Sequence, residues 1–148
     1  MRLSLIIFII LISAAGYFAA EQLQQNAGGQ LVQPKGNALE KYDLVRVSSP
    51  QSNGFIRSPV LVEGKARGYW FFEAVFPVKI ADEDGTVLGQ GTAHALSDWM
   101  TENFVPFQTT VRFDLPSGER GFVILERDNP SGLEENADEL RIPVRFAE

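Results

Sequence analysis

Residues that could perform acid–base or nucleophilic chemistry are scarce in this chain. Its 148 residues include one histidine, His94, and no cysteine, so it has no thiol nucleophile and no thiolate metal ligand. His94 stands among small residues, without the sharp turn that presents the nucleophile of a Ser-His-Asp arrangement, and we expect it to be structural. No paired-ligand spacing for zinc occurs. We therefore expect no catalytic residue, no metal site, no cofactor and no enzymatic activity.

Two acidic stretches are the remaining candidates for cation chemistry. Asp82-Glu83-Asp84-Gly85 lacks the ligand spacing and the closing glutamate of a calcium loop, and its Asp-Gly pair predicts a hairpin turn instead. Residues 128–139 contain five carboxylates and neither lysine nor arginine. We expect a solvated loop there, with a weak cation site as the alternative.

Aromatic side chains offer a binding surface rather than a reactive one. Glu73 stands in a dense aromatic run, where a carboxylate needs either an ion pair or a ligand. Its candidate ion-pair partners are Arg67, Arg112 and Arg127. Residues 98–107 are rich in apolar side chains, which either plug one end of the fold or form an exposed patch for a protein or a glycan. The candidate ligand-binding residues are Tyr69, Phe71, Glu73, Trp99, Met100 and Phe104.

Short apolar runs separated by turn residues must position these side chains. The predicted strands are 44–48, 58–63, 69–81, 87–95, 107–113, 121–127 and 140–146. Alternation in the third of them predicts one core face, which consists of Trp70, Phe72, Ala74, Phe76, Val78 and Ile80. The pattern predicts an all-β, immunoglobulin-like domain over residues 42–148, with about seven strands in a two-sheet sandwich.

The first 41 residues differ in composition from this domain. Arg2 precedes an uncharged run over residues 3–20, which as a helix spans roughly 27 Å, close to the hydrocarbon thickness of a bilayer. We expect residues 1–20 to form a hydrophobic helix that stays in the membrane as a signal anchor. A signal peptide cleaved after Gly16 and a buried core helix are the alternatives. Residues 21–41, rich in Gln, Gly and Asn, are predicted to be a flexible linker.

Net charge and cysteine content limit the kinds of partner and of membrane attachment that the chain can have. A formal charge of −6 argues against nucleic acid as a partner and against adhesion of the domain to an anionic membrane surface. Without cysteine the chain has no lipidation site of the lipoprotein type and no disulfide, so the core alone must stabilise an exported domain.

Several runs of residues resemble, in order, one known family. They include Trp70-Phe71-Phe72-Glu73-Ala74, Asp98-Trp99-Met100-Thr101, Phe104-Val105-Pro106-Phe107 and Asp128-Asn129-Pro130-Ser131-Gly132. Together with shorter matches they span residues 45–146 and resemble the immunoglobulin-like domain of bacterial spore-germination and cell-envelope proteins, many of them lipoproteins. This chain departs from that pattern in lacking the lipidated cysteine and in carrying only this domain, so a role in germination does not transfer with the resemblance.

The resemblance implies a non-catalytic module that binds or assembles at the cell envelope. It implies an envelope protein or a cell-wall polymer as the partner. With residues 1–20 as a single membrane pass, we expect the domain to lie outside the cytoplasm, or to be secreted if the segment is cleaved. The alternative functions are a structural spacer in an envelope complex and a wall-polymer hydrolase.

Overall fold

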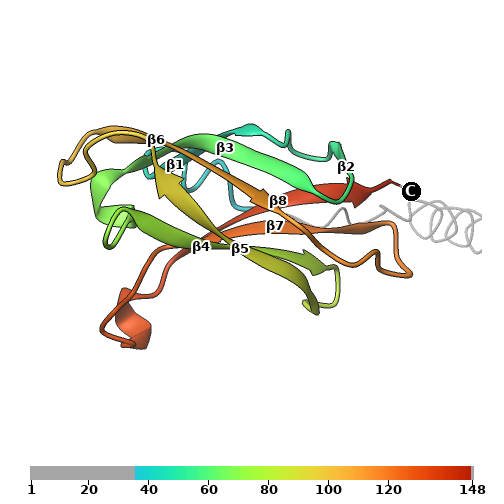
Figure 1. The fold of residues 1–148 in the computed structure, drawn as a ribbon. Coiled ribbons are helices and arrows are strands. Elements are labelled where there is room, and N and C mark those ends of the chain that lie inside the picture. The colour runs from blue at the N-terminus through green and yellow to red at the C-terminus, as the bar shows by residue number, and fades with distance from the viewer. Residues whose placement is uncertain (1–35, 148) are drawn as a thin grey trace, which may run out of the picture. The chain divides into compact units, whose positions relative to one another are not determined.

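Residues 36–147 form an all-β fold in the computed structural model, which describes this part of the chain (Figure 1). The strands are β1 (Val45–Ser49), β2 (Phe55–Ile56), β3 (Val60–Arg67), β4 (Val75–Asp82), β5 (Val87–Ala95), β6 (Phe104–Val111), β7 (Arg120–Glu126) and β8 (Glu139–Phe146). Two short 3-10 helices are η1 (Gly68–Trp70) and η2 (Glu134–Asn136). The predicted N-terminal helix lies outside the described residues. Within residues 36–147, no helix is long and apolar enough to span a bilayer.

Hydrogen bonds join the eight strands into one curled sheet, in the order β1-β3-β6-β5-β4-β7-β8-β2. Neighbouring strands are antiparallel, except that β2 runs parallel to β8. The all-β class is thus confirmed. Two separate sheets are not confirmed, because a short β5–β6 pairing connects the β1-β3-β6 half to the rest (Figure 1).

Only a short antiparallel ladder links β5 to β6. These strands pair only at His94 with Gln108 and Ala95 with Phe107. Beyond that point β5 passes very close to the chain that follows β6: a Cβ on Gly89 would overlap the carbonyl oxygen of Arg112. A residue without a side chain is therefore required at position 89.

Residues 37–41, at the start of the described chain, pack against β8 and the residue before it. The amide of Asn37 donates to the carbonyl of Arg141 in β8 (3.2 Å), and the Asn37 side-chain amide donates to the carbonyl of Glu139 (2.9 Å). Lys41 forms an ion pair with Asp138. The last residues of the predicted linker are thus part of the fold, where they pack beside β8.

The core is apolar, and aromatic rings occupy its centre. The ring of Phe76 contacts Phe71 and Phe107 in edge-to-face geometry, with centroids 5.0 and 4.9 Å apart. All four residues from Phe122 to Leu125 are buried, so β7 is covered on both faces. On the predicted core face of the third strand, Trp70, Phe76, Val78 and Ile80 are fully buried.

The third predicted strand is wrong in its first part. Residues 69–74 do not form a continuous strand: η1 is followed by a tight turn, and β4 begins only at Val75. Phe72 and Val75 exchange two backbone hydrogen bonds of 3.0 Å around Glu73 and Ala74, whose φ angles are 50° and 66°. This two-residue turn reverses the chain and resets the alternation. Consequently Phe71 is buried, at 4% exposed, whereas Phe72 is 41% exposed.

Candidate functional site

Two loops meet at one end of the curled sheet. Residues 68–74 connect β3 to β4, and residues 96–103 connect β5 to β6 (Figure 1). The amide of Gly68 donates to the carbonyl of Asn103 (3.1 Å), and a Cβ on Gly68 would overlap the carbonyl oxygens of Trp99 and Thr101. The loops are therefore in backbone contact, which only glycine at position 68 permits.

The turn at residues 72–75 is also fixed at this end of the sheet. The amide of Ala95 donates to the carbonyl of Ala74 (2.8 Å), which holds the turn against the end of β5. Large apolar side chains are exposed on these segments, and we call them the loop-end patch: Tyr69 at 49%, Phe72 at 41%, Leu96 at 60% and Met100 at 76%. Four large apolar side chains are thus exposed on two contacting loops, which makes this end of the fold a candidate interaction surface.

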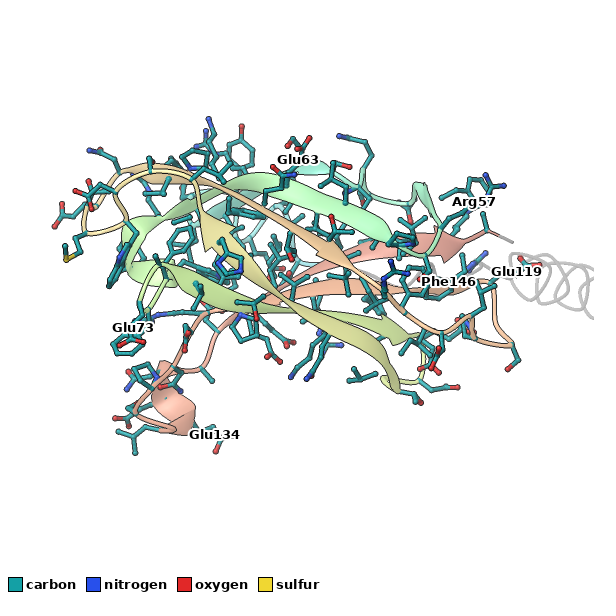
Figure 2. The ribbon with its side chains drawn as sticks, viewed as in Figure 1. Arg57, Glu63, Glu73, Glu119, Glu134 and Phe146 are labelled. Atoms are coloured by element: carbon teal, nitrogen blue, oxygen red, sulfur yellow. The ribbon has the colours of Figure 1, made fainter. Side chains whose placement is uncertain are left out.

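Acidic residues border the loop-end patch. Glu73, Asp98 and Glu102 are all exposed, and Figure 2 shows Glu73 projecting at this end of the domain. The side chain of Asp98 also accepts a hydrogen bond from the amide of Met100 (3.0 Å), which shapes the loop that presents Met100. The patch thus combines an apolar centre with a negatively charged margin.

The structure separates the predicted ligand-binding residues into three groups. Tyr69, Glu73 and Met100 are exposed at the loop end. Trp99 is half-buried and packs against the core, so it plugs the end of the fold, and Phe71 is inside the core. Phe104 is half-buried beneath basic side chains. Sequence reasoning missed Phe72, which it assigned to the core, and Leu96, which has only the small Ala95 and the polar Ser97 beside it.

Glu73 has no ion pair among the described residues. The candidate partner Arg67 donates instead to the carbonyls of Asp43 (3.0 Å) and Glu102 (3.2 Å). Because Glu73 lies at the tip of a turn rather than within a strand, its carboxylate is exposed to water and needs no basic partner.

The other candidates from the sequence lie elsewhere. His94 is exposed on β5. The predicted Asp-Gly hairpin turn is confirmed: the side chain of Asp82 accepts from the amides of Asp84 (3.1 Å) and Thr86 (2.7 Å). The acidic loop is held by its own polar groups, such as Asn129 and Ser131. Within residues 36–147, no three His, Asp or Glu side chains converge as metal ligands would.

A polar pocket of about 700 Å³ opens between residues 37–41, the end of β7 and residues 128–139. Five of its lining residues carry carboxylates: Glu40, Glu126, Asp128, Asp138 and Glu139. Three of these carboxylates form ion pairs, with Lys79, Lys41 and Arg141. The ion pairs stabilise the walls of the pocket and leave two carboxylates, on separate segments, without a basic partner among the described residues.

Measurements of stability can test whether the backbone is strained in the turn at Glu73 and Ala74. Alanine at a positive φ is strained, so Ala74→Gly is expected to raise the free energy of unfolding by about 0.5–1 kcal/mol. Ala137→Gly is the matched control, because Ala137 has a φ of −74°. That change is expected to lower stability by about 0.5–1 kcal/mol, since glycine only adds freedom to the unfolded chain. Urea unfolding measures the free energy of unfolding of both variants. If both variants were less stable than the wild type, the turn would be unstrained.

The fold and the loop-end patch together define a small all-β module that presents an apolar surface on loops. Residues 44–133, more than half of the chain, match the family model described as the immunoglobulin-like domain of bacterial spore germination. The chain belongs to this family, which confirms the resemblance seen in the sequence. The matched residues include both loops of the patch. The chain matches no curated protein and no solved structure.

Proposed function

We propose that this protein is a non-catalytic binding or assembly module of the bacterial cell envelope. In this proposal residues 1–20 hold it in the membrane, and its domain faces away from the cytoplasm. The two halves of the curled sheet correspond to the two sheets of an immunoglobulin sandwich. Membership of the spore-germination family supports an envelope module. The observation that carries binding is the loop-end patch, with four exposed apolar side chains on two contacting loops.

The patch favours a protein as its partner. Its apolar side chains project from loops, so they suit insertion into another surface rather than enclosure of a small ligand. The acidic margin from Glu73, Asp98 and Glu102 would pair with lysine or arginine at the rim of that surface. A polymer of neutral sugars would use the apolar centre but leave these carboxylates without a partner.

Partner capture by the full chain tests this proposal. A photo-crosslinking residue at Tyr69 is expected to capture an envelope protein in cells, and the double variant Phe72→Ser, Met100→Ser should reduce that product by about tenfold or more, because apolar anchors dominate such interfaces. The matched control is Val87→Ser, Leu115→Ser, which removes side chains of comparable exposure, 50% and 57%, outside the patch. Equal loss in both variants, or no specific product, would favour the spacer alternative.

A further inference from the structure

Basic side chains gather around one aromatic ring on the outer face of the β1-β3-β6 half. The guanidinium carbons of Arg46 and Arg67 lie 4.3 and 4.2 Å from the ring centroid of Phe104, and the ammonium of Lys65 lies 5.6 Å from it. Arg46 also lies 4.1 Å from the ring centroid of Tyr42. The register explains the cluster, because Arg46 is opposite Lys65 and Arg67 is opposite Phe104. We call these residues the basic cluster.

Neutral groups hold the two guanidinium groups in place. Arg46 donates from Nε to the carbonyl of Tyr42 (2.9 Å), and Arg67 donates to two backbone carbonyls. Among the described residues, the one ion pair of the cluster joins Arg46 to Asp43 at 3.9 Å, and the Asp43 side chain is 91% exposed, so this pair adds little. Rings and carbonyls orient the cations without cancelling their charge. Lys65 and Arg67 have no carboxylate partner among the described residues.

Three positive charges close together in a chain of net charge −6 require an explanation. Like charges held near one another repel, and a bound anion removes that repulsion. Along β3, Lys65 and Arg67 are about 7 Å apart, and β1 lies about 5 Å from β3. The charged ends of these side chains converge on the ring of Phe104. Three cations with only one distant carboxylate partner carry more positive charge than one phosphate group neutralises, so the cluster suits a ligand with several anionic groups in succession. Guanidinium groups bind phosphate through paired N–H donors.

We propose that the basic cluster binds a linear polymer that carries phosphate at repeated intervals. An open groove of about 270 Å³ lies beside the cluster, and its lining includes Arg46, Ser48, Lys65 and Pro106. The groove lies on a sheet face and is not enclosed, as a chain that continues in both directions requires. This inference does not rest on the loop-end patch, because other side chains carry it, although Glu102 borders both and its carbonyl accepts a hydrogen bond from Arg67.

The surroundings of the basic cluster disfavour other phosphate-bearing partners. Asp43, Glu63 and Glu102 border it, and Figure 2 shows Glu63 projecting from β3 on this face. These carboxylates would be repelled by a flat anionic membrane, whereas a narrow chain passes between them. Guanidinium groups already cover the ring of Phe104, and Arg46 also lies over the ring of Tyr42, so cations occupy the aromatic faces on which nucleic-acid bases would stack.

Binding of fluorescent inorganic polyphosphate to the full chain in detergent tests the proposal by anisotropy. The double variant Arg46→Gln, Lys65→Gln is expected to bind roughly tenfold more weakly, and the slope of log affinity against log salt should fall by about 1.4, since each lost phosphate contact removes about 0.7. Arg112→Gln, Arg120→Gln removes the same charge elsewhere and should change neither quantity appreciably. Lys65→Gln alone, which breaks no hydrogen bond, should weaken binding about threefold.

Three results would overturn the proposal. The first is no binding of polyphosphate at low salt, and the second is equal weakening by the cluster variant and its control. The third is binding to phosphatidylglycerol vesicles without binding to soluble polyphosphate, which would identify a membrane contact. The loop-end variant Phe72→Ser, Met100→Ser should retain full polyphosphate binding. Failure of partner capture and failure of polymer binding are therefore distinguishable.

Discussion

Phe71→Ala and Phe76→Ala are each expected to lower the free energy of unfolding by about 3–5 kcal/mol, whereas Phe72→Ala should lower it by less than about 1 kcal/mol. Phe71 and Phe76 are 4% and 0% exposed and their rings are in contact, so either truncation leaves a cavity in the aromatic core. Phe72 is 41% exposed on the loop-end patch, and its truncation leaves none.

The order of these three effects tests the turn at residues 72–75. A continuous strand over residues 69–81 places Phe72 on the core face with Phe76, and Phe71 on the opposite face. Under that interpretation Phe72→Ala would be the costly change and Phe71→Ala the mild one. Chemical unfolding of the full chain, followed by tryptophan fluorescence, measures all three. A Phe72→Ala variant as unstable as Phe76→Ala would contradict the turn.

The strands were predictable because period-2 alternation and turn residues are local signals. Each of the seven predicted strands overlaps an observed strand, and the hairpin at Asp84-Gly85 is present. The strand β2, with only Phe55 and Ile56, is too short to show a period, and its parallel pairing with β8 joins residues far apart in the chain. Long-range pairing of so short a segment leaves no local trace in the sequence.

The turn at Glu73 and Ala74 escaped prediction for a different reason. Neither residue is one that usually occupies a turn with positive φ, where Asn and Gly are preferred. The apolar alternation from Trp70 to Ile80 also continues through the turn without a break. Tertiary contacts therefore impose the turn: the carbonyl of Ala74 accepts from the amide of Ala95, and the core encloses Phe71.

The sequence located the loop end but not the basic cluster. Trp99 and Met100 stood out because their loop is unusually apolar, whereas Arg46, Lys65 and Arg67 are ordinary residues on exposed strand faces. Only the register of β1, β3 and β6 brings them around Phe104. A net charge of −6 hides this local excess of positive charge, because net charge does not show how charges are distributed.

Gly68→Ala is expected to destabilise the domain by about 1–3 kcal/mol and to abolish partner capture through the loop-end patch. The added Cβ would overlap the backbone carbonyl oxygens of Trp99 and Thr101, and a backbone cannot move aside as a flexible side chain can. Residues 68–74 and 96–103 must then separate, and the hydrogen bond from Gly68 to Asn103 is lost. The patch would be divided, because Tyr69 and Met100 belong to the two loops that this contact joins.

Gly118→Ala is the matched control for this change, because its Cβ would have only the Glu83 carboxylate near it, at 3.9 Å. That variant should keep wild-type stability within about 0.5 kcal/mol and should retain partner capture. Hydrogen exchange provides a local measurement: in Gly68→Ala the amides of residues 96–103 should exchange faster, while the amides of β7 and β8 keep their protection relative to the new global stability. If Gly68→Ala matches Gly118→Ala in stability and in exchange, the two loops are not held together at Gly68, and the loop-end patch is not a single preformed surface.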